Sequence, residues 1–427
     1  MACDENTTTV ALTLALVTPA GDAPAELGIP GATLRLQQRS DEATSEQAWT
    51  LPGPDFDLRL PLADSTTLQL QAELRGGDII RVGATPPFAL PSAGGFVRLP
   101  LTTVGTCTPL TAWTLPAQTE GAATLLMDSF VVGVGGTGDG VPRSTSWTYD
   151  RLRLGLADGP EAPLALGPAR AVRLDDTRAL TLGAQGQALQ VQLSHTTPTR
   201  FVPLPALYPG AGGATAMRHV PAQGAVLAGG QEGAVAVDSV LWVAVDGSLS
   251  PARLSTGRSQ ASALLVDDGV WLVGGADPAA PLIDVLAVGQ ARAQALTVAV
   301  DARWQQTRAL WDAPTRTLVL LRPDASLLLR GCPAACVAET VGPPPASFTD
   351  ATLWSDGQQH RLVGGSPDSS VLEAQVSATG IDWQLVARLT HARTTPTVHA
   401  LEAGTLLVLG GSSTAPYAEL CATETIP

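Results

Sequence analysis

Cysteine is the residue type with the most definite chemistry in this sequence, which contains five of them. Cys332 and Cys336 lie four positions apart, whereas Cys107 and Cys421 flank most of the chain. Four cysteines allow three pairings, and we expect the disulfides Cys332–Cys336 and Cys107–Cys421. A zinc site is the alternative for the close pair, but no second cysteine pair or nearby histidine completes one. The cysteines therefore predict an oxidising compartment outside the cytoplasm.

Cys3 has no partner in this scheme. It follows Ala2 and precedes a short polar segment at residues 4–9. This start resembles the mature N-terminus of bacterial lipoproteins, in which the cysteine carries the lipid anchor. The resemblance implies lipidation at Cys3, a location at the bacterial outer membrane or cell surface, and membrane contact through that anchor alone. The alternative is a terminal thiol without a function.

A short apolar run that usually ends in two glycines recurs along the chain, and we call it the glycine signature. Four arginines stand 14 to 18 residues before the last residue of a copy of this signature: Arg170, Arg258, Arg308 and Arg393. The similar offsets predict that they occupy the same place in four structural repeats. One interpretation is structural, with each guanidinium tying neighbouring repeats together through backbone carbonyls. The other is a ring of guanidinium groups at one rim of a channel, which binds a carboxylate or an acidic loop.

The other candidates for catalysis or metal binding form no recognisable site. Neither zinc-ligand spacing nor a His-Glu-x-x-His motif occurs among the five histidines, which are His195, His219, His360, His391 and His399. Gly-x-Ser-x-Gly is absent, and the glycine-rich segment 133–138 lacks the lysine of a phosphate loop. We therefore predict no catalytic residue, no metal and no cofactor, and a protein that is not an enzyme.

Charge and composition narrow the classes of partner. The 427 residues carry a net charge of −14, and all 25 cationic side chains are arginines. An acidic chain without lysine is poorly suited to nucleic acid, so we expect no such partner. The sequence contains no run of 18 apolar residues, so it does not predict a membrane-spanning helix. The 43 glycines and 34 prolines fit many short strands joined by tight turns.

The glycine signature recurs about every 46 residues through the last three quarters of the sequence. Each copy ends a short apolar run; five copies end in Gly-Gly, and two end in Gly183-Ala184 and Arg322-Pro323. The last residues of the seven copies are at positions 136, 184, 230, 275, 323, 365 and 411. Each repeat has room for four short strands. Repeats of this size must stack or close into a ring to bury their apolar faces.

The repeats resemble kelch repeats, in which a Gly-Gly pair ends the second strand and a tryptophan-containing strand follows. Trp147, Trp242 and Trp383 follow the first, third and sixth signatures, whereas the second, fourth and fifth repeats lack these aromatic residues. The resemblance implies an all-β fold with a seven-bladed kelch-like β-propeller at residues 105–427.

The two ends of the repeat region predict how a ring closes. The seventh repeat has room for only three strands, whereas an extra segment at residues 109–116 precedes the first repeat and is similar to residues 382–386. We expect this segment to complete the last repeat, which places Cys107 beside Cys421. A disulfide there closes a loop of more than 300 residues, and chain-entropy models assign such a loop about 4–5 kcal/mol of stabilisation.

Residues 1–104 lack the repeat and show a period of two instead, as at residues 9–17, 56–62 and 67–74. This alternation, broken by glycine and proline, predicts a β-sandwich of about seven strands. The segment 28–36 resembles the carboxypeptidase-regulatory-like and other immunoglobulin-like modules of secreted proteins, which implies a stalk.

These patterns favour a binding function at the cell envelope or surface. A propeller presents loops over a rigid ring, so we expect the partner to be a protein or a surface polysaccharide. The kelch resemblance also implies a carbohydrate-active alternative, a sugar oxidase or a sialic-acid epimerase. The copper site of the oxidases needs Tyr, His and Cys ligands, and no such cluster is apparent. A third hypothesis is a structural subunit of a surface layer or appendage.

Overall fold

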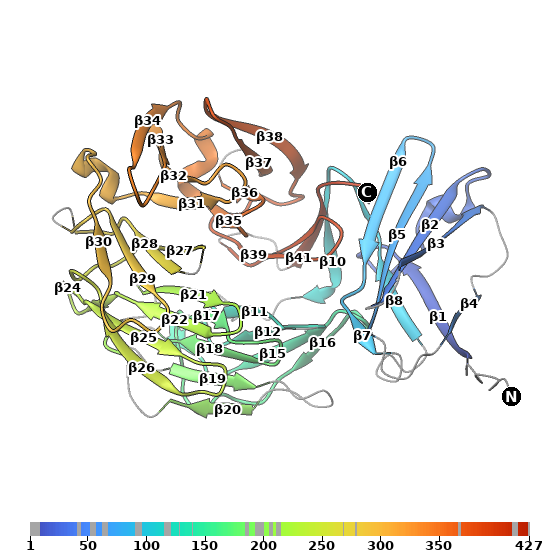
Figure 1. Cartoon of the computed structure of the whole chain (residues 1–427). Coiled ribbons are helices and arrows are strands. Elements are labelled where there is room, and N and C mark those ends of the chain that lie inside the picture. Colours follow the sequence, from blue (N-terminus) through green and yellow to red (C-terminus); the bar gives the residue numbers. More distant parts are fainter. Residues whose placement is uncertain are drawn as a thin grey trace, which may run out of the picture.

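The computed structural model shows a nearly all-β protein (Figure 1). It describes residues 9–40, 44–51, 57–61, 67–89, 96–114, 121–127, 129–138, 140–183, 188–192, 200–204, 208–210, 215–267, 269–277, 280–365, 369–411 and 417–425. Helical structure in these ranges consists of three short 3₁₀ turns: η1 (Ala25–Gly28), η2 (Ala302–Gln305) and η3 (Ala346–Asp350). No helix among the described residues has the length and apolar character that crossing a membrane requires.

Seven four-stranded antiparallel sheets are formed by the described residues after position 106, and we number them by the order of their first strands. Sheet 1 contains β11 (Ala123–Met127), β12 (Phe130–Val134), β15 (Ser146–Asp150) and β16 (Gly155–Asp158). Sheet 2 contains β17 (Arg170–Arg173), β18 (Arg178–Leu182), β19 (Ala188–Gln192) and β20 (Arg200–Pro203). Sheet 3 contains β21 (Ala216–Val220), β22 (Gly224–Ala228), β25 (Ser239–Val243) and β26 (Leu249–Arg253).

The remaining sheets follow the same plan. Sheet 4 contains β27 (Ser262–Val266), β28 (Gly269–Val273), β29 (Ile283–Ala287) and β30 (Gln294–Leu296). Sheet 5 contains β31 (Arg308–Asp312), β32 (Thr317–Arg322), β33 (Ala325–Arg330) and β34 (Val337–Val341). Sheet 6 contains β35 (Ala351–Ser355), β36 (His360–Gly364), β37 (Ser370–Val376) and β38 (Ile381–Arg388). Sheet 7 contains β39 (Thr397–Ala400), β40 (Thr405–Leu409), β41 (Tyr417–Ala422) and, from the other end of the chain, β10 (Cys107–Thr114).

Two small hairpins follow the glycine pairs of sheets 1 and 3: β13 (Thr137–Gly138) with β14 (Val141–Pro142), and β23 (Gln231–Glu232) with β24 (Val235–Ala236). Within the sheets, burial follows strand order. Every residue of β22, β36 and β40 is buried, which agrees with the continuous apolar runs of these second strands. The fourth strands β26 and β34 are largely exposed.

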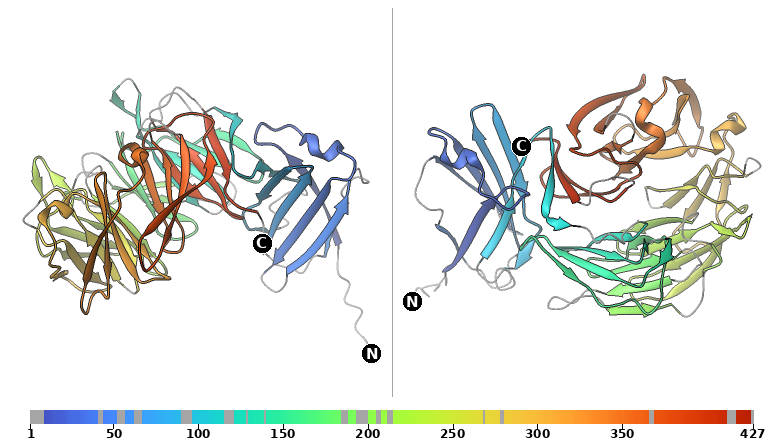
Figure 2. Two further views of the ribbon diagram at one scale, coloured as in Figure 1. Left: turned by 90° about the horizontal axis from the view of Figure 1, so that it is seen from above. Right: turned by 180° about the vertical axis from the view of Figure 1, so that it is seen from behind.

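The first strands of the seven sheets contact one another in a cyclic order. Strand β11 contacts β17, and the contacts continue through β21, β27, β31, β35 and β39. Strand β39 then contacts β11 again. Figures 1 and 2 show the sheets arranged around these strands. Each apolar face is therefore covered by the neighbouring sheet, as in the shared core of Val226, Val270 and Leu286 from sheets 3 and 4.

The glycine pairs form the joints between consecutive sheets. The N–H of the second glycine donates to a carbonyl in the segment that enters the next sheet, at N···O distances of 2.8–2.9 Å: Gly136 to Gly167, Gly230 to Arg258, Gly275 to Gln305 and Gly365 to Arg393. These second glycines have φ values between +89° and +133°, which L side chains rarely adopt. A Cβ on Gly230 would lie 2.4 Å from Thr215 Oγ1, and one on Gly365 would lie 2.2 Å from Ser347 O. The pair therefore supplies both the backbone conformation and the close approach that the joint needs.

Sheet 7 unites the two ends of the repeat region. Strand β10 pairs antiparallel with β41, and the register places Cys107 opposite Cys421. These two cysteines form a disulfide, and Cys332 and Cys336 form a second one in the turn between β33 and β34. Both expected disulfides are thus present, and they fit an oxidising compartment outside the cytoplasm.

Residues before position 104 form two further sheets, which we call the N-terminal sheets. One has the order β4-β1-β8, and the other has the order β3-β2-β5-β6-β9, with β7 paired to β5. Their strands are β1 (Thr9–Val17), β2 (Thr33–Ser40), β3 (Thr44–Thr50), β4 (Asp57–Pro61), β5 (Thr67–Gly76), β6 (Ile79–Ala84), β7 (Phe88–Ala89), β8 (Phe96–Pro100) and β9 (Thr102–Thr103). Leu14, Leu34, Leu70 and Leu99 from these strands share one apolar core.

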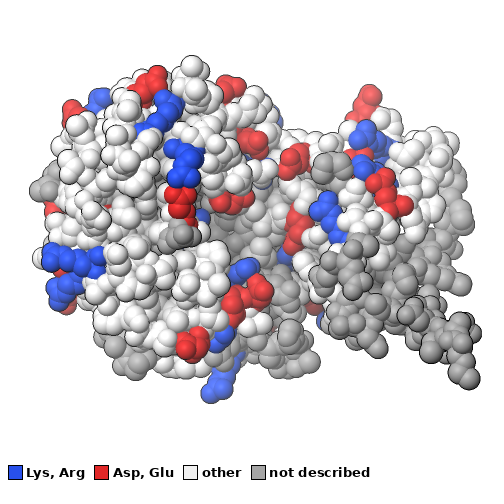
Figure 3. Space-filling model, in the orientation of Figure 1, with Lys and Arg blue, Asp and Glu red and all other residues white. Residues whose placement is uncertain are grey.

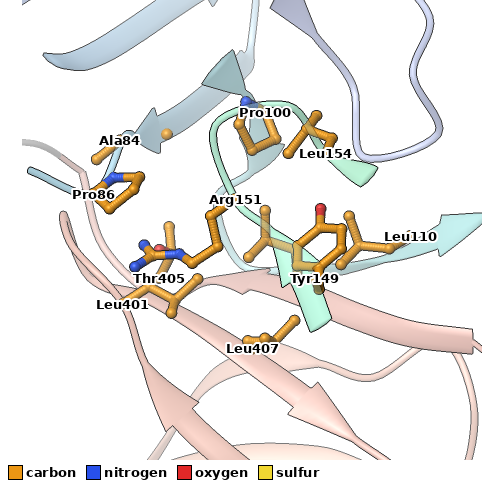
Figure 4. Close-up of a pocket in the computed structure, with 12 residues that line it drawn as sticks. Ala84, Pro86, Pro100, Leu110, Tyr149, Arg151, Leu154, Leu401, Thr405 and Leu407 are labelled. Carbon is orange, nitrogen blue, oxygen red and sulfur yellow. The ribbon is translucent and has the colours of Figure 1, made fainter. Parts of the chain in front are cut away.

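The N-terminal sheets lie to one side of the seven sheets, next to β10, β16 and β41 (Figures 1 and 2). Leu152, in the turn after β15, packs into the core of the N-terminal sheets, and its carbonyl accepts from the N–H of Arg98 at 3.0 Å. Beside it, Arg151 pairs with Glu402 of sheet 7. Figure 4 shows Arg151 and Tyr149 next to Ala84, Pro86 and Pro100 of the N-terminal sheets.

The register fixes which end of the seven sheets meets the N-terminal sheets. Asp150 pairs with Phe130, at the end of β12 away from its glycine pair, and Ala422 pairs with Thr405, at the end of β40 away from its pair. The turn at residues 150–154 and the Cys107–Cys421 disulfide therefore lie at the end opposite the glycine pairs. The end with the glycine pairs, which we call the glycine end, is not the end that the N-terminal sheets contact.

We predict that Gly230→Ala lowers the free energy of unfolding by several kcal/mol, because the new Cβ meets Thr215 and the backbone of Gly210. Gly233→Ala is the matched control, since Gly233 also has a positive φ, +62°, but its Cβ would meet no atom within 4 Å. The control should lose only about 1 kcal/mol. Denaturant unfolding of both variants measures the difference; equal losses would contradict the account of the joint.

Candidate functional site

A cavity of about 680 Å³ opens at the glycine end. Its lining includes the first residues of three first strands: Arg170, Ser262 and Arg308. These residues pair with the glycine-signature ends of the second strands, as Arg308 does with Leu321. The rest of the lining comes from sheets 4 to 6 and the segments that enter them: Gln260, Ala261, Gly275, Ala276, Gln305, Gln306, Thr307, Leu321, Pro323, Phe348 and Thr349. No Asp or Glu is among these described lining residues.

Arg170 and Arg308 are the two charged side chains in this lining. Arg308 is half-buried and donates to the carbonyls of Phe348 at 3.0 Å, Thr349 at 2.8 Å and Ala351 at 2.6 Å. Its guanidinium carbon lies 4.8 Å from the centre of the Phe348 ring. These contacts hold Arg308 at the start of sheet 6 with a fixed orientation.

Arg170 is exposed and less constrained. Its Nη1 donates to the Thr215 carbonyl at 3.0 Å, which joins the starts of sheets 2 and 3. This is the one hydrogen bond that the Arg170 side chain makes to a described residue, whereas a guanidinium has five N–H donors. Desolvation by the surrounding protein lowers the pKa of Arg170, and it also lowers the pKa of Arg308 against a weaker opposing effect of Asp350. In both cases the surrounding protein disfavours the charged form of the side chain.

Arg258 and Arg393 lie in a different place from the other two arginines. Each is 1% exposed and stands four residues before a first strand, in the segment that receives the glycine N–H of the preceding sheet. Arg258 donates to Gly274 O at 2.8 Å and to the carboxylate of Asp284 at 2.9 Å. Arg393 repeats the pattern in sheet 7, where it donates to the carbonyl of Gly410 at 2.8 Å and to the carboxylate of Glu419 at 2.9 Å.

The expectation of four equivalent arginines on one rim is therefore corrected. Arg258 and Arg393 are sealed inside sheet joints, where Asp284 and Glu419, both 0% exposed, neutralise them. They fit the structural interpretation and cannot reach a ligand. Arg170 and Arg308 also bind carbonyls of the following sheet, but they line the cavity at the glycine end.

Buried Arg258 and exposed Arg170 should respond differently to the same substitution. Arg258→Gln leaves Asp284 buried without a cation, so we expect a loss of roughly 3–5 kcal/mol in unfolding free energy. Arg170→Gln removes one hydrogen bond at an exposed position and should cost no more than about 1 kcal/mol. Thermal and denaturant unfolding of the two variants test this ordering. A stable Arg258→Gln variant would refute the structural role.

The described histidines lie at separate places rather than in one site. His399 on β39 contacts Thr124 on β11 at 3.0 Å, across the junction of sheets 7 and 1. His219 contacts the Arg173 carbonyl at 2.9 Å, and His391 lies 3.6 Å from Glu419. His195, like Cys3, lies outside the described residues. Among those that are described, no group of three His, Cys, Asp or Glu side chains is placed to hold a metal ion.

Ser355, His360 and Asp312 form a hydrogen-bonded chain that the sequence motifs did not indicate. Ser355 Oγ lies 2.8 Å from His360 Nδ1, and His360 Nε2 lies 2.9 Å from Asp312 Oδ1. Asp312 Oδ2 accepts from the N–H of Thr315 at 2.9 Å. His360 and Asp312 are buried between sheets 5 and 6 at the end opposite the cavity. The chain therefore joins two sheets, although its residue types match those of a catalytic triad.

The junction of sheets 7 and 1 predicts a pH dependence of stability. Burial, with a smaller effect of the Arg151 charge, lowers the pKa of His399 to about 4. Its ordinary value is 6.5, so between these values the unfolded chain binds a proton that the folded chain does not. Stability should therefore fall as the pH drops from 6.5 to 4, by about 3 kcal/mol from this residue.

The measurement is the unfolding free energy of the wild type and of His399→Gln between pH 7 and pH 4. We expect the variant to lose about 3 kcal/mol less than the wild type over this range. Parallel pH profiles for the two proteins would show that His399 is not responsible.

Several exposed arginines outside the cavity form ion pairs. Figure 3 shows acidic and basic atoms next to each other in small groups, separated by wide uncharged areas. Exposed pairs include Arg253–Asp238, Arg316–Asp267 and Arg330–Glu339. Arg170 and Arg308 differ from these surface arginines because no ion pair is found for either among the described residues.

Comparisons with known proteins give a limited result. No protein-family model matches the sequence, and no curated protein matches it significantly. One solved structure that resembles the fold is titled "Structure of YjhT"; it is 12% identical, covers 72% of this chain and 94% of its own, and has a TM-score of 0.44.

Proposed function

We propose that the protein is a non-catalytic binding protein of the cell envelope or surface, and that it recognises its partner at the glycine end. In this proposal residues 105–427 form a seven-bladed kelch-like propeller, and residues 1–104 form a β-sandwich stalk with a lipid anchor at Cys3. The cyclic contacts of the first strands and the pairing of β10 with β41 support the propeller. The partner is a surface polysaccharide or a protein.

The observation that carries the proposal is the cavity of about 680 Å³ with its polar, cationic lining. Cavities of this size are typical of ligand sites. Its walls are the starts of strands and the joints between sheets, so they are held rigidly and lose little entropy on binding. The stalk contacts the opposite end, which leaves the glycine end directed away from the N-terminal sheets.

The experiment compares two tryptophan variants at exposed glutamines. Gln306→Trp places an indole in the cavity, whereas Gln358→Trp places one in the turn between β35 and β36, at the opposite end. Wild type and both variants are immobilised and screened against an array of bacterial surface saccharides and against envelope proteins. We expect Gln306→Trp to lose binding and Gln358→Trp to keep it.

Two outcomes would contradict this proposal. Equal binding by both variants would move the recognition surface away from the cavity. Conversion of a captured saccharide by the wild type, lost in Gln306→Trp, would establish a carbohydrate-active enzyme instead of a binding protein.

A further inference from the structure

We propose that the cavity at the glycine end binds an acidic saccharide whose carboxylates pair with Arg170 and Arg308. This inference rests on the proposed function and names the ligand class of that site.

The described lining of the cavity contains two arginines and no carboxylate. Arg258 and Arg393 each have a carboxylate of the protein within 2.9 Å, as buried arginines require. Arg170 and Arg308 line one cavity in a chain with a net charge of −14, and none of the described lining residues is Asp or Glu. Asp350 acts on Arg308 from outside this lining, but neither arginine forms an ion pair with a described residue. Two such cations at a cavity fit an anionic ligand.

The protein around Arg170 and Arg308 also affects the stability of their charges. The surrounding protein lowers the pKa of both arginines, which disfavours their charged forms; Asp350 offsets this effect only in part at Arg308, and no carboxylate among the described residues offsets it at Arg170. A bound carboxylate would restore that lost stabilisation. Three backbone carbonyls already orient the Arg308 side chain. Arg170 uses one N–H donor on a described residue, which leaves its other donors for a ligand. Guanidinium groups bind carboxylates with two parallel hydrogen bonds when their donors face the ligand.

The polar groups around the two arginines are neutral amides and hydroxyls. Gln260, Gln306, Ser262 and Thr349 supply amides and hydroxyls, which donate and accept hydrogen bonds as sugar hydroxyls do. An acidic peptide would gain more from apolar pockets. Leu321 and Phe348 are the large apolar side chains in this lining, and the other apolar ones are Ala261, Ala276 and Pro323. The ring of Phe348 is in part covered by Arg308. The lining therefore fits a carboxylated sugar better than a peptide.

The test uses isothermal titration calorimetry with defined oligosaccharides. The probes are trimers of galacturonate, glucuronate, mannuronate and guluronate, together with the methyl ester of each. We expect at least one acid to bind and its ester to bind at least tenfold more weakly. Arg170→Gln should weaken binding of the acid at least tenfold, whereas Arg170→Lys should retain part of it. Raising the salt concentration should weaken binding of the acid and leave binding of the ester unchanged.

Arg173→Gln is the matched control, because Arg173 lies at the far end of the same strand and pairs with Asp176. It should bind the acid as the wild type does. Thermal unfolding of each variant separates loss of binding from loss of folding, which matters most for Arg308→Gln with its three carbonyl contacts.

Each remaining outcome overturns the inference in a distinct way. Equal binding of acid and ester, blocked by Gln306→Trp, would retain the cavity as a saccharide site but reject the carboxylate contact. Binding of triglutamate in place of all four acids would identify an acidic peptide ligand. Binding of a sulfated heparin trisaccharide alone would identify a sulfate ligand. If no probe binds, the acidic saccharide is rejected, while the array screen still decides whether the glycine end binds a partner.

Discussion

One backbone hydrogen bond, repeated from sheet to sheet, is the constraint on which the rest of this structure depends. The second glycine of a pair turns its N–H toward the segment that enters the next sheet, and a side chain at Gly230 or Gly365 would collide with the neighbouring chain. At these four junctions, between sheets 1 and 2, 3 and 4, 4 and 5, and 6 and 7, consecutive sheets are held at close range. Close approach lets the apolar faces of neighbouring sheets share one core, as sheets 3 and 4 do. Two arginines reinforce the joint: the carbonyls of Arg258 and Arg393 accept the glycine N–H, and their guanidinium groups bind the following sheet.

The same joints determine what the glycine end can do. In the connecting segments, Arg258 and Arg393 are buried and neutralised by carboxylates, so these two arginines contribute to folding alone. Where an arginine begins a first strand, as Arg170 and Arg308 do, it reaches the cavity while one edge remains tied to backbone carbonyls. At the opposite end, Leu152 packs into the core of the N-terminal sheets. The Arg151–Glu402 pair there joins sheets 1 and 7, and the Cys107–Cys421 disulfide links the two strands that close sheet 7. In the proposed function, recognition and the contact with the N-terminal sheets therefore lie at opposite ends of the seven sheets.

Much of this arrangement could be predicted from the sequence, because it depends on local patterns. The spacing of the glycine pairs indicated four-stranded repeats, and the positions of the cysteines indicated both disulfides. The separation of the arginines into two kinds could not be predicted. An offset of three or four residues decides whether an arginine begins a strand or precedes it, and the spread of 14 to 18 residues concealed that difference. The partners Asp284 and Glu419, the Ser355–His360–Asp312 chain and the contact of Leu152 depend on distant segments meeting, which no local pattern records.

Native-state hydrogen exchange of the amides of Gly136, Gly230, Gly275 and Gly365 tests the central claim most directly. If these N–H groups hold consecutive sheets together, they should exchange only through opening of the whole assembly of sheets. The account predicts that their opening free energies equal one another and equal those of amides in the buried second strands β22 and β36. Fast, independent exchange at the glycines, with the second strands still protected, would show that the sheets are held together by side-chain packing and that the glycine joints are incidental.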